Sequence, residues 1–220
     1  MDSIPMVCFP HAGAGRLSYS RWQRDFSSIV NLQVVQHPLR EHRLHTPMPT
    51  SIGELAEDIF AELEEVFRGP YAIWGHSMGS VIGYEVAKLC QERLGNPPLT
   101  FFSSGSAAPC RTRFTRVGDL DTDEGFRDVL MHYGGVPEEY LQDADYMRYF
   151  APVIKADLRL LGSYRDVMCV PLQSPVVLML GRDDTVTADR SWAPRQPAVA
   201  AADDQGIVHA DCTMFEFRRN

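Results

Sequence analysis

Residues 75–79 read Gly-His-Ser-Met-Gly, a G-x-S-x-G pentapeptide, and its surroundings constrain the fold more than any other feature. An apolar run over 71–74 precedes it and predicts a buried strand, whereas 80–94 carries apolar residues at helical spacing. A serine between a strand and a helix must occupy a sharp turn, and a glycine two residues to either side lets the backbones approach closely. The sequence therefore predicts a strand–turn–helix unit with Ser77 at the turn.

Strand-like and helix-like segments alternate along the first half of the chain. Short apolar runs bounded by turn residues predict strands, and helical spacing predicts helices over 19–26 and 52–66, the second with the capping-box pair Ser51 and Glu54. The further predicted strands are 4–9, 32–35, 99–103 and 175–180. This alternation is typical of βαβ units, so we expect an α/β fold with a mainly parallel sheet and helices on both faces.

The regular alternation stops after residue 106. The segment 107–165 is polar, helix-prone and rich in aromatic residues, and the strand pattern returns only at 175–180. We therefore expect a core formed by 1–106 and 166–220, interrupted by a lid insert at 107–165. Three prolines, two arginines and two histidines in 38–49 also predict an exposed loop.

A serine hydroxyl is a poor nucleophile at neutral pH unless a base takes its proton and an acid orients that base. After a turn of this kind the three residues follow in the order serine, acid, histidine. Asp183 and Asp184 come directly after the 175–180 strand, and either is a candidate acid. His209 is the only later histidine, which makes it the candidate base. The alternatives without chemistry are an Asp-rich turn and a surface histidine.

Acyl transfer also needs two N–H donors for the oxyanion that develops on the carbonyl. The residue after the nucleophile, Met78, is expected to supply one. The small-residue loop after the first strand is expected to supply the other, from Ala12. His11 and His76 also lie near the site, where we expect structural or hydrogen-bonding roles.

Composition excludes several other classes of protein. A chain of 220 residues is one large domain or two small ones, and its net charge of −8 argues against binding to nucleic acid. The five cysteines are scattered without metal-ligand spacing, as expected for reduced thiols in the cytoplasm. No apolar run is long enough for a membrane span, and the first residues predict no signal peptide.

The order of the motifs resembles the type II thioesterases of polyketide and non-ribosomal peptide biosynthesis, which have the α/β-hydrolase fold. The resemblance covers about residues 4–192. The motifs that carry it are 9–15 (Phe-Pro-His-Ala-Gly-Ala-Gly), 40–43 (Arg-Glu-His-Arg), 75–79, 133–137 (Tyr-Gly-Gly-Val-Pro), 150–157 (Phe-Ala-Pro-Val-Ile-Lys-Ala-Asp) and 181–184 (Gly-Arg-Asp-Asp). It implies that Ser77 and Asp184 are catalytic and that Met78 and Ala12 form the oxyanion hole.

The chain departs from this family pattern in two places. Leu39 stands before Arg40 where such proteins usually have glycine. The family's usual Gly-Gly-His-Phe segment is missing, and His209 lies 25 residues after Asp184 among residues that do not match. Two alternatives stay open. The pentapeptide alone does not separate this family from an esterase of the same fold, and the atypical tail suggests an inactive carrier-binding remnant.

The resemblance implies hydrolysis of acyl or aminoacyl thioesters on the phosphopantetheine arm of acyl or peptidyl carrier proteins. No metal and no cofactor would be needed, and a monomer is expected. The insert would cover the acyl chamber, with its tyrosines and Phe150 facing the acyl chain. Basic residues would meet an acidic carrier, although a solvated surface is the commoner role of such clusters. These residues are Arg40 and Arg43, or Arg111, Arg113 and Arg116.

Overall fold

The computed structural model describes residues 3–109, 112, 114–134, 136–166 and 170–181. Within these residues five strands form one sheet in the order β2-β1-β3-β4-β5, and every neighbouring pair is parallel. The strands are β1 (Ile4–Phe9), β2 (Val30–Val34), β3 (Ala72–His76), β4 (Phe101–Ser104) and β5 (Val176–Met179). The predicted parallel α/β architecture is therefore confirmed.

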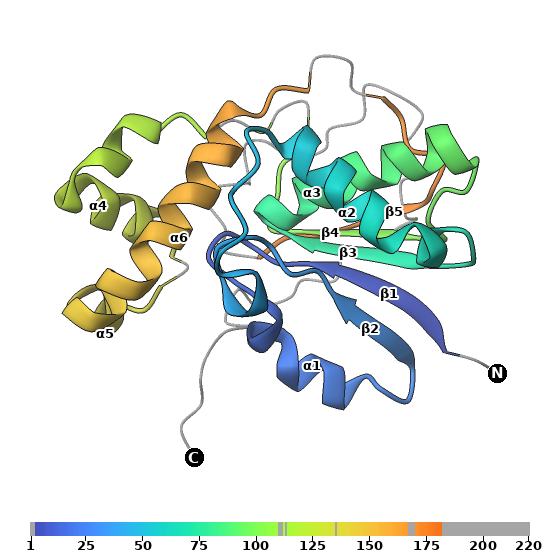
Figure 1. Ribbon diagram of the computed structural model, residues 1–220, viewed down its shortest axis with the longest axis horizontal. Coiled ribbons are helices and arrows are strands. Elements are labelled where there is room, and N and C mark those ends of the chain that lie inside the picture. Colours follow the sequence, from blue (N-terminus) through green and yellow to red (C-terminus); the bar gives the residue numbers. More distant parts are fainter. Residues whose placement is uncertain (1–2, 110–111, 113, 135, 167–169, 182–220) are drawn as a thin grey trace.

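Successive side chains of the strands alternate between two apolar layers, as the pleat of a strand requires. Val7 and Phe9 pack in the cluster that contains buried residues of α2 (Ile52–Phe67) and α3 (Met78–Leu89). Cys8 lies between them in sequence and packs in the opposite cluster, beside Tyr19 at the end of η1 (Arg16–Tyr19). Figure 1 shows α2 and α3 on one side of the sheet and α1 (Ser20–Asp25) on the other.

The observed helix boundaries differ from the predicted ones by only a few residues. Ser51 caps α2 by accepting the N–H of Glu54 at 3.1 Å, but the Glu54 carboxylate accepts from the backbone N–H of Thr50 rather than from Ser51. The helix predicted over 80–94 begins earlier, with α3 at Met78. It ends in a π-helical turn, η3 (Cys90–Leu94), which the left-handed Gly95 terminates.

The predicted insert is helical over most of its described part. It contains η5 (Val117–Asp121), α4 (Asp123–Tyr133), α5 (Glu138–Leu141) and α6 (Ala144–Ser163). These helices share their own apolar cluster and lie together beside the sheet in Figure 1. α6 belongs to both clusters, because Ile154 packs among the insert helices and Leu160 packs in the sheet cluster. The division into core and lid stays a prediction.

The aromatic side chains of α5 and α6 stack on one another. The ring centroids of Tyr140 and Tyr146 lie 5.0 Å apart, and those of Tyr146 and Phe150 lie 4.5 Å apart. Tyr149 is 65% exposed, and the expected contact of these rings with an acyl chain stays a prediction. No helix among the described residues is long and apolar enough to cross a membrane.

The strand order places a topological switch point between β1 and β3. The chain passes from β1 to its neighbour β2 and then returns to pair β3 with the other side of β1. In open parallel sheets such a switch point separates the loops that follow the two strands and forms the ligand-binding crevice at their carboxyl ends. Phe9 is paired with Gly75, so the loop after β1 and the turn after β3 leave the sheet side by side.

Candidate active site

Ser77 connects β3 to α3 in a backbone conformation that non-glycine residues rarely adopt. Its dihedral angles are φ 53° and ψ −117°, and its N–H donates to the carbonyl oxygen of Ser104 at 2.8 Å. A hydrogen bond from Ser80 Oγ to the Gly75 carbonyl oxygen, at 2.7 Å, ties the first turn of α3 back to β3. Strain of this kind persists only where surrounding contacts hold it, and it clusters at functional sites. The predicted turn at Ser77 is present.

Close backbone contacts leave no room for a side chain at either glycine of the pentapeptide. A Cβ on Gly75 would lie 2.5 Å from the Gly79 carbonyl oxygen. A Cβ on Gly79 would lie 1.9 Å from the carbonyl oxygen of Phe9, at the end of β1. Both glycines therefore allow α3 to begin directly against the sheet, and this contact leaves Ser77 half-buried at the sheet edge.

Two backbone elements near Ser77 can supply N–H donors. Met78 is the first residue of α3, and the first N–H groups of a helix have no acceptor within the helix and lie at its positive end. Ala12 lies in the loop after β1, beside the Ser77 turn, because β1 and β3 are paired. The fold thus brings Ser77, Met78 and the Ala12 loop to one edge of the sheet. Their roles in catalysis stay predictions.

Two histidines flank these residues. The rings of His11 and His76 lie edge to face with centroids 5.5 Å apart. His76 Nδ1 is 3.0 Å from Ser104 Oγ, and His11 Nδ1 is 3.3 Å from the hydroxyl of Tyr19. Burial lowers the pKa of His11 to about 3, and the charges of His76 and Arg40 add to this effect. His11 is therefore neutral at neutral pH and serves in hydrogen bonding and packing.

The candidate acid and base lie outside the described residues. Asp183, Asp184 and His209 all follow the last described residue, Gly181. β5 runs parallel to β4 and pairs Met179 with Ser104, so the chain leaves the sheet at the edge where Ser77 lies. The positions of Asp183, Asp184 and His209 stay predictions from the sequence.

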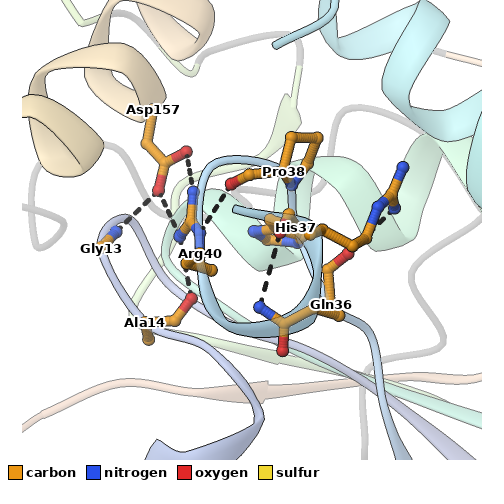
Figure 2. Close-up of polar contacts among 8 residues, drawn as sticks. Gly13, Ala14, Gln36, His37, Pro38, Arg40 and Asp157 are labelled. Atoms are coloured by element: carbon orange, nitrogen blue, oxygen red, sulfur yellow. Dashed lines mark hydrogen bonds and ion pairs between the residues drawn. The ribbon is translucent and has the colours of Figure 1, made fainter. Parts of the chain in front are cut away.

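Arg40 and Asp157 form a buried ion pair beside the Ala12 loop, shown in Figure 2. Their relative exposures are 7% and 1%. The prediction that Arg40 lies in an exposed loop and meets a carrier protein is therefore wrong. Its guanidinium is held by Asp157 and by the carbonyl oxygens of Pro38 and Ala14, which compensate the charge that burial removes from water.

The other basic residues named from the sequence differ in position. Arg43 donates to the Gln36 carbonyl oxygen at 3.0 Å, and Arg116 pairs with Asp119 at 2.6 Å. Arg111 and Arg113 lie outside the described residues. Sequence reasoning assigned no role to Asp157. The signal that could have identified Asp157 is its position at the end of the 150–157 motif, within a helix that has an apolar face.

No group of three or more metal-ligating side chains lies close enough to hold a metal ion within the described part of the chain. The described residues place the Ser77 hydroxyl at the sheet edge, at the N-terminus of α3.

Comparisons with known proteins place this arrangement in a family. The thioesterase domain family matches residues 4–219. The chain is 31% identical over 194 residues to the medium-chain S-acyl fatty acid synthase thioesterase of Rattus norvegicus, covering 85% of this chain and 73% of that protein. It is 30% identical to the gramicidin S biosynthesis protein GrsT of Aneurinibacillus migulanus, covering 82% and 71%.

Solved structures agree. RedJ, the thioesterase from the prodiginine pathway of Streptomyces coelicolor, is 33% identical with a TM-score of 0.72, over 81% of this chain and 70% of RedJ. YbtT, the type II thioesterase of the yersiniabactin pathway, is 28% identical with a TM-score of 0.70, over 82% and 74%. The resemblance inferred from the sequence motifs is thus confirmed. The chain belongs to the thioesterase family, as a hydrolase of the α/β-hydrolase fold that acts on thioesters.

Proposed function

We propose that this protein hydrolyses acyl or aminoacyl thioesters from the phosphopantetheine arms of carrier proteins and so clears stalled synthases. The single observation that carries the proposal is the strained Ser77 turn, at the switch point of the sheet and at the N-terminus of α3. The similarity to type II thioesterases of polyketide and non-ribosomal peptide pathways supports the choice of substrate.

The reaction has two steps in this proposal. Ser77 Oγ attacks the thioester carbonyl carbon while His209 takes the hydroxyl proton. The carbon–sulfur bond breaks, and the phosphopantetheine thiol leaves with that proton. Water then attacks the acyl-serine ester, His209 takes a proton from the water and returns it to Ser77, and the carboxylic acid is released. Asp184 orients His209 by accepting its ring N–H.

The backbone N–H groups of Met78 and Ala12 stabilise the oxyanion in both steps. Such donors act on charge that develops only in the transition state, and loss of one donor costs about 2.7–4 kcal/mol. The α3 N-terminus adds positive potential at the same place. The rate therefore depends on the position of the Ala12 loop as well as on the base.

The segment 107–165 acts as a lid over the acyl chain in this proposal, and 1–106 with 166–220 forms the hydrolase core. Support comes from α6, whose Ile154 packs against Gly13 of the loop that carries Ala12. The partner is an acyl or peptidyl carrier protein domain, which brings the phosphopantetheine arm. The protein itself needs neither metal nor cofactor, and it works as a cytoplasmic monomer.

The test compares hydrolysis of an acyl carrier thioester with hydrolysis of a p-nitrophenyl ester of the same acyl chain. A higher kcat/KM on the thioester is expected, and Ser77→Ala should abolish both activities. A clear preference for the oxygen ester would instead indicate a general esterase. A wild-type protein that does not react with a fluorophosphonate probe would support the inactive remnant.

Substitutions of the candidate acids and of the candidate base test their assigned roles. Asp184→Asn and His209→Ala should each lower kcat by orders of magnitude, because the proton of Ser77 is no longer removed efficiently. Asp183→Asn is the matched control, and it should retain most of the activity. If Asp183→Asn has the large effect and Asp184→Asn the small one, the acid is Asp183. Wild-type rates for His209→Ala would remove that residue from the mechanism.

A further inference from the structure

The loop that carries Ala12 is held by side chains from two distant parts of the chain. The N–H of Gly13 donates to Asp157 Oδ2 at 2.7 Å, from α6. Arg40 Nη1 donates to the carbonyl oxygen of Ala14 at 2.9 Å. Figure 2 shows both contacts converging on the two residues that follow Ala12. The backbone next to the proposed oxyanion donor therefore donates a hydrogen bond to Asp157 and accepts one from Arg40, and these two side chains form an ion pair with each other.

The next residues of this loop are held from the Arg40 side as well. Gln36 Oε1 accepts the N–H of Arg16 at 3.2 Å, and Glu41 Oε1 accepts the N–H of Leu17 at 3.1 Å. Both acceptors are close neighbours of Arg40 in sequence. The segment 36–41 thus fixes the end of the loop, while α6 fixes its middle through Asp157.

The Arg40–Asp157 contact is bidentate and enclosed. Nη1 lies 2.8 Å from Oδ2, and Nη2 lies 2.6 Å from Oδ1. Burial raises the pKa of the Asp157 carboxyl, whereas Arg40 and the Gly13 N–H oppose this shift. Desolvation offsets much of the attraction within a buried ion pair, so this pair is weak evidence for added stability.

Strained backbone on both sides of Arg40 indicates that its position is functionally constrained. Leu39 and Glu41 both adopt left-handed conformations, with φ 65° and 47°. Such conformations persist where other contacts over-determine them, and they cluster at functional sites. Arg40 is buried, whereas Leu39 on one side is half-buried and Glu41 on the other is exposed.

Gly13 links the pair to α6 sterically. Its φ is +83°, and a Cβ at this position would lie 2.6 Å from Ile154 Cγ1. Ile154 and Asp157 are three residues apart on α6 and share a helix face. One face of α6 therefore contacts the Gly13 backbone with an apolar side chain and a carboxylate.

We propose that Arg40 and Asp157 are positioning residues that hold the Ala12 N–H in the oxyanion hole, so that the contact between α6 and this loop sets the rate of acyl transfer. This inference rests on the proposed function and goes beyond it. It makes the charged pair responsible for transition-state stabilisation, with no contact to the substrate.

The experiment uses Asp157→Asn, which keeps the shape of the side chain but removes its charge. Activity on an acyl thioester is normalised to the serine titrated by a fluorophosphonate, so that unfolded protein does not count. We expect kcat to fall about 30- to 300-fold with KM changed less than about threefold, as for a displaced oxyanion donor. Arg40→Lys, which keeps the charge and some donors, should lose less activity than Arg40→Gln.

A transition-state analogue separates positioning from a general structural role. The Ser77 hydroxyl adds to a trifluoromethyl ketone to form a tetrahedral oxyanion, whereas a thioether analogue of the substrate forms no oxyanion. In Asp157→Asn the affinity for the ketone should fall by the same factor as kcat/KM, and the affinity for the thioether should not change. Equal losses for both analogues would overturn the positioning role.

The exposed ion pair between Arg159 and Asp121 provides the matched control, because Arg159 lies on the same helix as Asp157. Asp121→Asn should change kcat less than twofold. If Asp157→Asn keeps wild-type kcat and wild-type ketone affinity, the inference is overturned while the proposed function stands. If the wild-type protein reacts with neither the ketone nor the fluorophosphonate, both fail.

Discussion

A Cβ placed on Gly79 would lie 1.9 Å from the carbonyl oxygen of Phe9. The contact is to backbone, so no side-chain rotation can relieve it. It joins the first turn of α3 to the end of β1, the strand that leads to the Ala12 loop. This close approach sets the distance between the serine turn and the loop proposed to stabilise its oxyanion.

Gly79→Ala is therefore expected to destabilise the fold by at least about 1–3 kcal/mol, the usual cost of forcing a methyl group into a packed site. It should also lower kcat, because α3 must move away from β1. Urea unfolding and thioester hydrolysis measure the two effects. The control is Gly118→Ala, since nothing lies within 4 Å of a Cβ at Gly118. A change within about 0.5 kcal/mol for both variants would contradict the steric argument.

The strain at Ser77 predicts a difference between two inactive variants. Glycine tolerates φ 53° and ψ −117° far better than alanine does. Such strain costs about 1–3 kcal/mol, and the extra flexibility of glycine in the unfolded chain offsets part of this. Ser77→Gly should thus be more stable than Ser77→Ala by about 1 kcal/mol in urea unfolding. If Ser77→Ala is the more stable, the turn stores no strain.

Leu39 offers a similar comparison at a position away from the serine. Its φ of 65° is unfavourable for residues with a Cβ by about 1–2 kcal/mol, and its side chain is half-buried. Leu39→Gly and Leu39→Ala both remove the side chain, but only glycine relieves the backbone. We expect the glycine variant to have the higher free energy of unfolding. Equal stabilities would mean that the segment 36–41 relaxes to avoid the strain.

His37 predicts a dependence of stability on pH. Its side chain is fully buried, and neither ring nitrogen has a hydrogen-bond partner among the described residues. Burial lowers the pKa of His37 to about 3, with Arg40, Arg43 and His11 adding to this effect. The unfolded chain therefore binds a proton near the ordinary histidine pKa of 6.5, while the folded chain does not.

The sign follows from this difference in bound protons. The stability that neutral His37 contributes is complete above about pH 6.5 and falls as the pH is lowered toward 3. The slope approaches about 1.4 kcal/mol per pH unit for each such histidine, and His11 adds a second. His37→Leu should reduce the slope of the unfolding free energy against pH, between pH 6.5 and 5, by up to about 1.4 kcal/mol per pH unit, which corresponds to one bound proton.

Several features were predictable from the sequence because short-range patterns determine them. The apolar run over 4–9, the Ser51 cap of α2 and the glycines around Ser77 each specify local backbone geometry. The parallel sheet followed from the spacing of these elements. Asp184 and His209 rest on chain order and on resemblance, and they stay predictions.

The surroundings of Arg40 were not predictable in this way. Arginine in a segment with three prolines is usually solvated, and only its partner makes burial tolerable. That partner, Asp157, lies 117 residues further along the chain on a helix with no local link to Arg40. No pattern within one segment contains this pairing.

The sequence alone determined the elements of this protein, its family and its serine turn, because these depend on neighbours within a few residues or on motifs in a fixed order. The tertiary structure alone decided the strand order that sets the Ala12 loop beside Ser77. It also decided that a charged pair buried under α6 holds that loop. The physical reason is that burying two charges costs free energy, and this cost is offset only when the whole fold brings the charges together.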